Sequence, residues 1–67
     1  MKKLTPGEIV RLIRQCQGMT QEEFGVSLGY STGHICMVET GDRPVSLQMA
    51  KKIIALDDNY TLDDLLG

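Results

Sequence analysis

Residues 19–41 read MTQEEFGVSLGYSTGHICMVETG, and this stretch decides the fold. Its apolar residues recur at helical spacing in two groups, Phe24 with Leu28 and Ile35 with Val38. That spacing places each group on one face of a helix, and no part of the chain alternates as a half-buried strand would. Because only residues 29–31 separate the two predicted helices, the helices cannot lie antiparallel and must cross at a steep angle. Gly29 supplies the left-handed backbone that such a turn needs.

Working outward, each apolar group follows a residue whose side chain can cap the free amides of a first helical turn. The candidate N-caps are Thr5, Thr20, Ser31, Ser46 and Thr61. An apolar residue precedes each of them, as a hydrophobic staple requires, and glycines follow where helices should end. The signals predict helices over residues 6–17, 21–28, 32–40, 47–56 and 62–66.

The length of 67 residues is sufficient for one small hydrophobic core, so we expect a single domain over residues 1–67, with residues 1–4 as a flexible arm. Cys16 and Cys36 are too few for a disulfide framework and lack the spacing of metal ligands, so reduced thiols are expected. We therefore predict no metal, no cofactor and a cytoplasmic location. Near the N-terminus, Pro6 interrupts the sequence before any long apolar segment can form, which argues against a signal peptide or a membrane span.

The formal net charge is −2, which argues against a protein that coats nucleic acid without regard to sequence. The charges are unevenly distributed. Residues 1–14 carry four bases against one acid, whereas residues 57–67 carry four acids and no base. The distribution indicates that the N-terminal part of the chain is better suited than the C-terminal part to face phosphate.

The segment from Thr20 to Gly41, with the helices around it over residues 5–66, resembles the Cro and phage-repressor (XRE-type) helix-turn-helix family. The resemblance implies an all-α, compact five-helix domain of the lambda-repressor type, in which the second and third helices form the helix-turn-helix. It also implies a sequence-specific transcriptional regulator of bacterial or phage origin. Such a protein would be a repressor that binds double-stranded operator DNA as a homodimer through its recognition helix, residues 32–40.

The resemblance also implies roles for particular residues. Arg14 and Glu39 match positions that form an internal ion pair in similar repressors, although from the residues alone they read as surface charges. The expected base-facing residues are Gln21, Thr32, Gly33, His34, Cys36 and Met37. The expected phosphate-binding residues are Thr20, Ser31, Thr40 and Arg43. The expected dimer interface comprises Tyr60, Leu62, Leu65 and Leu66.

The predicted recognition helix departs from the usual pattern because it has no Arg, Lys, Asn or Gln, the side chains that most often bond guanine and adenine. Base readout would depend on the Thr32 hydroxyl, on Gln21 and His34, on apolar contact of Met37 or the Thr32 methyl with thymine, and on DNA shape. An exposed face bearing Met and Cys is equally suited to binding a protein. A protein-interaction module, such as an antirepressor or antitoxin-like partner, is therefore the alternative function.

An enzyme is not expected, because the chain has one histidine and no carboxylate pair at useful spacing. Cys36 has no assigned base, so it is a poor candidate for a nucleophile.

Overall fold

The computed structural model describes residues 4–66, so residues 1–3 of the expected flexible arm lie outside the described range. Within that range all regular secondary structure is helical: α1 (Pro6–Cys16), α2 (Gln21–Leu28), α3 (Thr32–Thr40), α4 (Leu47–Leu56) and α5 (Leu62–Leu66). The predicted all-α, five-helix fold is confirmed. The bounds agree with the prediction except that α1 ends one residue early, with Gln17 as its C-cap.

The helix starts are held by the predicted caps. The hydroxyls of Thr5, Thr20, Ser31 and Ser46 each accept a hydrogen bond from a backbone amide of the following first turn. At the start of α5, the Thr61 hydroxyl accepts from the Asp64 amide at 3.3 Å, and the Asp64 carboxylate accepts from the Thr61 amide at 3.0 Å. Because these interactions are local, the helix starts depend little on tertiary packing.

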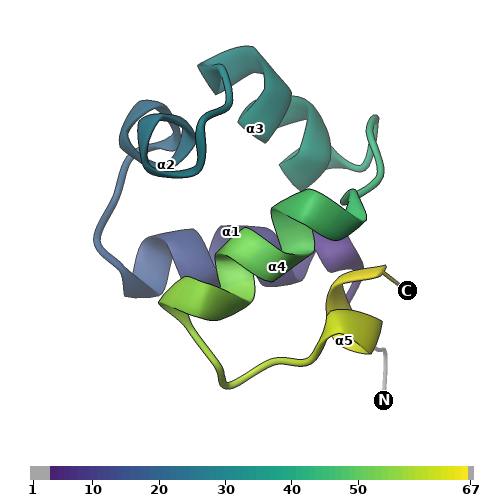
Figure 1. The fold of residues 1–67 in the computed structure, drawn as a ribbon. Coiled ribbons are helices and arrows are strands. Elements are labelled where there is room, and N and C mark those ends of the chain that lie inside the picture. The colour runs from purple at the N-terminus through teal and green to yellow at the C-terminus, as the bar shows by residue number, and fades with distance from the viewer. Residues whose placement is uncertain (1–3, 67) are drawn as a thin grey trace.

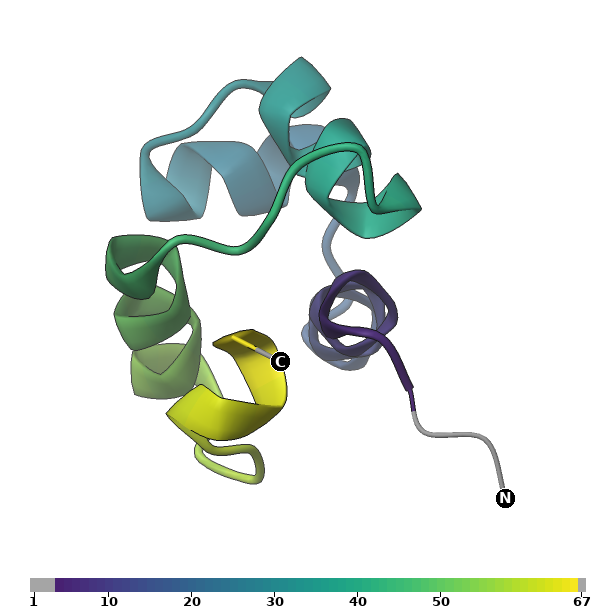
Figure 2. The same ribbon diagram turned by 90° about the vertical axis from the view of Figure 1, so that its right-hand side faces the viewer.

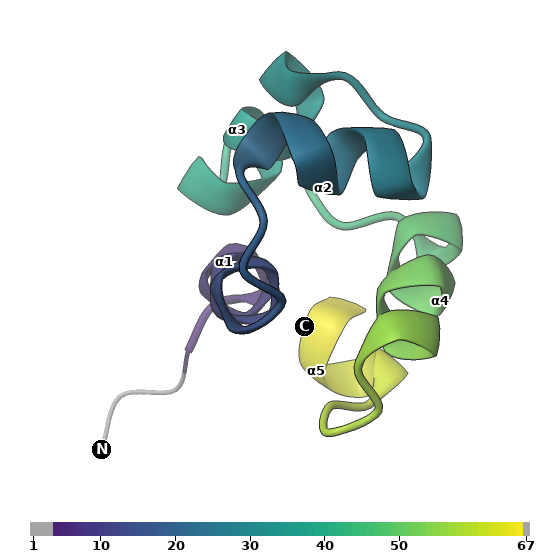
Figure 3. The ribbon, with the colours of Figure 1, turned by 90° about the vertical axis from the view of Figure 1, so that its left-hand side faces the viewer.

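The helices are arranged so that α3 lies at the surface. Figure 1 shows α2 and α3 together on one side, with α1 and α4 crossing beneath them. Figures 2 and 3 show α5 between α1 and α4, on the side away from α2 and α3. Packing agrees with these views, since α3 contacts α2 and α1, and α5 contacts α1 and α4. α5 thereby packs on α1 and α4, and only its last residues approach the end of α3.

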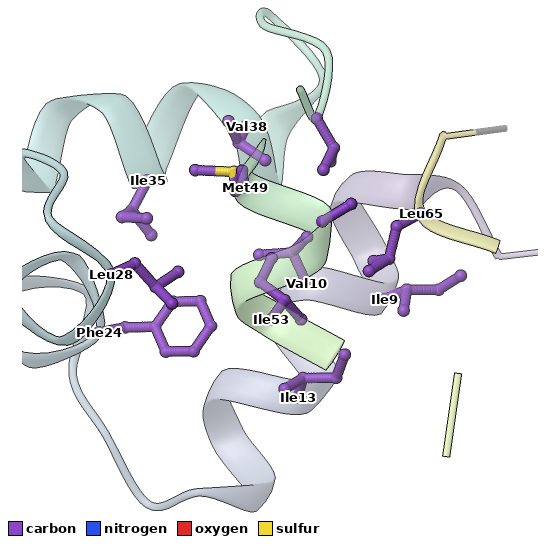
Figure 4. Close-up of a cluster of buried hydrophobic side chains, with 12 residues drawn as sticks. Ile9, Val10, Ile13, Phe24, Leu28, Ile35, Val38, Met49, Ile53 and Leu65 are labelled. Atoms are coloured by element: carbon purple, nitrogen blue, oxygen red, sulfur yellow. The ribbon is translucent and has the colours of Figure 1, made fainter. Parts of the chain in front are cut away.

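A core built from every helix fills the centre of the molecule (Figure 4). Phe24 is its largest fully buried side chain, and the others are Ile13, Ile35, Met49, Ile53, Leu65, Val10 and Val38. Burying a side chain of this size contributes about 1.5 to 3 kcal/mol relative to leaving it exposed. Leu65 of α5 is part of this core and has no exposed surface.

In α1 and α4 the buried face is shifted around the helix from the one that the apolar spacing marks. In α1 the helically spaced apolar residues include Leu12 and Cys16, yet Val10 is buried while Leu12 is 37% exposed and Cys16 is exposed. In α4 Met49 is buried while Leu47 is 50% exposed. These shifts accompany the close contact of α1 with α3 at Gly7 and the packing of α4 on α5.

Gly7 allows α1 and α3 to approach closely. A Cβ atom at this position would overlap the carbonyl oxygen of Val38 and lie 2.9 Å from that of Glu39. Both obstacles are backbone atoms, which cannot move aside without displacing α3.

We predict that Gly7→Ala destabilises the fold by about 1 to 3 kcal/mol, because the added methyl forces α1 away from α3. Gly33→Ala is the matched control, since a Cβ there meets nothing within 4 Å. The control should be neutral or stabilising by up to about 1 kcal/mol through helix propensity. Urea unfolding of both variants measures the difference, and equal stabilities would contradict the close contact between α1 and α3.

Candidate nucleic-acid interface

The carboxylate of Glu39 joins three helices beneath the outer face of α3. Its side chain is fully buried, whereas that of Arg14 is 15% exposed. Arg14 Nε donates to Oε2 of Glu39 at 2.7 Å and Nη2 donates to Oε1 at 3.3 Å, so the guanidinium binds the carboxylate in a bidentate manner. Arg14 Nη1 also donates to the carbonyl of Met19 at 2.9 Å, just before α2 begins. Bidentate pairing fixes the relative orientation of the two side chains as well as their distance, so it holds α3 in one position against α1.

Two further side chains complete this group. Arg11 Nε lies 3.3 Å from Glu39 Oε1, and Gln21 Nε2 donates to the same oxygen at 3.1 Å. No role for Arg11 was predicted from the sequence, although its spacing of three residues from Arg14 places both on one helix face. Gln21, an expected base contact, is half-buried and its amide is engaged by Glu39. The bond to Glu39 uses one hydrogen of Nε2, so the second hydrogen and Oε1 can still contact a base while that bond is kept.

The environment sets the charge state of Glu39. Burial by itself raises the pKa of this carboxyl, but the hydrogen bonds from Arg14, Gln21 and Arg11 and the charge of Arg14 lower it further than burial raises it. The net effect is a pKa below the ordinary value of 4.5. Glu39 is therefore ionised at neutral pH, as a carboxylate acceptor must be to hold these donors.

The turn between α2 and α3 is shaped by two glycines and a lysine. Gly29 has φ of 84°, and the Gly25 carbonyl accepts hydrogen bonds from the amides of Gly29 and Tyr30, both at 2.7 Å. Lys52 of α4 donates to the carbonyl of Leu28 at 3.0 Å and lies 5.1 Å from the Tyr30 ring centroid. This cation stabilises the negative end of α2. Lys52 is thus exposed to solvent and still supports the turn through this bond.

The outer face of α3 carries most of the expected base-facing residues. Gly33, Cys36 and Met37 are exposed, and Thr32 is exposed on the flank. His34 is half-buried, with its ring centroid 4.8 Å from that of Tyr30. Ile35, Val38 and Glu39 face inward. The structure thus gathers Thr32, Gly33, Cys36 and Met37 on one accessible surface and leaves Gln21 at its edge.

The expected phosphate-binding residues differ in what they can still donate. The hydroxyls of Thr20 and Ser31 accept bonds as N-caps, which leaves their own hydrogens available. Thr40 Oγ1 lies 3.1 Å from the Met37 carbonyl and 3.3 Å from Asp42 Oδ2, so its hydrogen already has acceptors. Arg43 is exposed in the loop after α3.

The helix N-termini also differ in their suitability for an anion. The first turns of α3 and α4 contain no acidic residue, whereas that of α2 contains Glu22 and Glu23. Free amides and the helix dipole favour phosphate binding at the N-termini of α3 and α4, whereas the two carboxylates disfavour it at the N-terminus of α2.

A comparison with known protein families matches residues 10–65 to the family described as helix-turn-helix, the type of Cro and the phage repressors. The chain belongs to this family. This family consists of DNA-binding regulators, and α2 and α3 form the helix-turn-helix of this chain. A search of curated proteins finds no match to the chain.

Other features of the described residues bear on partners. No helix within residues 4–66 is both long enough and apolar enough to cross a bilayer. The same residues bring no three His, Cys, Asp or Glu side chains together as a metal site would require.

The expected dimer interface needs one correction. Leu65 has no exposed surface because it packs into the core between α1 and α4, so it cannot face a second subunit. Leu62 and Leu66 are 36% and 45% exposed, and Tyr60 is half-buried against the core. Leu66 also lines a cavity of about 330 Å³ together with Thr40 and Arg43, which brings the end of α5 close to the loop after α3.

We predict that Glu39→Ala lowers the free energy of unfolding by about 3 to 5 kcal/mol, because it leaves the largely buried guanidinium of Arg14 without its ion-pair partner. Arg11→Ala is the control, since the Arg11 side chain is 49% exposed and such pairs contribute about 0 to 1 kcal/mol. Urea unfolding of both variants tests this. Similar losses of stability in the two variants would show that Glu39 does not depend chiefly on Arg14.

Acid should weaken the same interaction. Since the folded state lowers the pKa of Glu39, its contribution is fully present above the ordinary value of 4.5 and is lost as pH falls through the lowered pKa. Unfolding free energies measured from neutral to acid pH should therefore fall less for Glu39→Gln than for the parent chain. Parallel curves for the two proteins would contradict the assigned ionisation.

Proposed function

We propose that the chain is a transcriptional repressor of bacterial or phage origin that binds operator DNA as a homodimer through α3. The observation that supports this most strongly is the exposed outer face of α3, held outward by the buried Glu39 and Arg14 while Ile35 and Val38 occupy the core. A helix presented in this way fits the width of the major groove. No catalytic role is proposed for any residue.

Phosphate contacts would flank the groove-reading helix. Arg43 supplies a positive charge next to α3, and the acid-free N-termini of α3 and α4 supply amides. The Thr20 and Ser31 hydroxyls can add hydrogen bonds. With few cations and a net charge of −2, binding should depend only moderately on salt.

In a dimer, each subunit would place its recognition helix in one half-site, and the two half-sites would lie one turn of DNA apart. Leu62, Leu66 and Tyr60 are the residues proposed for its interface, because they leave apolar surface accessible on α5 and just before it. The two exposed free cysteines suit a reducing compartment, and we place the protein in the cytoplasm.

A protein-binding role is the second candidate. It is favoured by the same outer face of α3, where Met37 and Cys36 are exposed next to each other and α3 has no Lys or Arg. Selection of duplexes from a random DNA pool separates the two functions. A repressor returns an enriched, partly symmetric sequence, whereas a protein-binding module returns none.

We predict opposite effects from two neighbouring side chains in the loop after α3. Arg43→Ala should weaken binding to all duplexes alike and reduce the salt slope by about 1, because one phosphate is no longer neutralised. Asp42→Asn should strengthen binding, because it removes a carboxylate that repels phosphate. Both residues are exposed, so stability should change by no more than about 0.5 kcal/mol. Fluorescence anisotropy over a salt series measures both, and unchanged affinities would place the phosphate backbone elsewhere.

A further inference from the structure

The outer patch of α3, defined as Gly33, Cys36 and Met37, offers apolar atoms where a DNA reader usually offers amides or guanidiniums. Cys36 and Met37 lie three and four positions after Gly33, so the three residues share one helix face. All are exposed, and Met37 keeps 37% of its surface accessible. A Cβ atom at Gly33 would meet nothing within 4 Å, so the backbone there can come close to a partner.

The stronger hydrogen-bond donors near this patch lie outside it and are partly engaged within the fold. Gln21 donates one hydrogen to Glu39 at 3.1 Å, and Arg11 and Arg14 donate to the same carboxylate. The Thr40 hydroxyl lies within hydrogen-bond distance of two acceptors. Thr32 can still donate from the flank, but the centre of the patch has no strong donor for the N7 and O6 of guanine.

Among the groups that base pairs present in the major groove, the C5 methyl of thymine is apolar. We propose that Met37, with Gly33 and Cys36 beside it, reads the operator by contact with thymine methyl groups. A flexible thioether fits an irregular apolar surface, and the missing side chain at Gly33 leaves room for the base edge to approach. The proposal rests on the proposed function, because it names the base chemistry that the same face selects.

The test uses the duplex selected from the random pool and matched duplexes in which each thymine is replaced singly by deoxyuridine. This change removes the methyl and keeps every hydrogen-bonding group. Affinity should fall about fourfold where Met37 covers a methyl, the loss expected for one buried carbon. Thymines that the protein does not touch serve as the internal control.

Variants of Met37 assign the effect to this side chain. Met37→Ala should bind the thymine and deoxyuridine duplexes equally, whereas Met37→Leu, which keeps the apolar contact, should retain the difference. Thermal unfolding of each variant verifies that the domain is folded.

The outcomes separate the two proposals. An enriched sequence whose affinity is unchanged by deoxyuridine at every thymine overturns methyl reading and leaves the repressor proposal intact. A penalty that persists in Met37→Ala overturns the assignment to Met37. A pool that returns no enriched sequence overturns both.

Discussion

The bond between the Arg14 guanidinium and the Glu39 carboxylate is the constraint on which the rest of this structure depends. A buried carboxylate is tolerated only when its charge is met by donors, and here three side chains from two other helices supply them. The donors come from α1 and α2, and the acceptor comes from α3. One charge therefore sets the relative position of all three helices, which nonpolar packing would define less sharply.

The consequence for function lies on the other side of α3. With Ile35, Val38 and Glu39 facing inward, the remaining surface of this short helix must face solvent. The close approach of α1 to α3 at Gly7 and the hydrogen bond from Lys52 to the Leu28 carbonyl add contacts on the inward side of the helix-turn-helix. The chain belongs to a helix-turn-helix family of DNA-binding regulators, and this surface is the one that we propose meets DNA.

Local features were readable from the sequence, whereas relative rotations were not. Caps and helix ends depend on neighbours within a few residues, and the predicted helices match the observed ones to within one residue. The inward faces of α1 and α4 depend on distant contacts, so the burial of Val10 and Met49 could not be inferred from spacing. The same reason explains Leu65, which was expected at an interface and lies in the core, and Gln21, whose amide is held by a residue 18 positions away.

Whether the outer face of α3 meets DNA can be measured by amide NMR during titration with the selected duplex. We expect the largest chemical-shift changes at Gly33, Cys36 and Met37 and smaller ones near Arg43, while a scrambled duplex of equal length should produce weaker changes. Changes concentrated on α5, with those three amides unaffected, would show that DNA binds elsewhere.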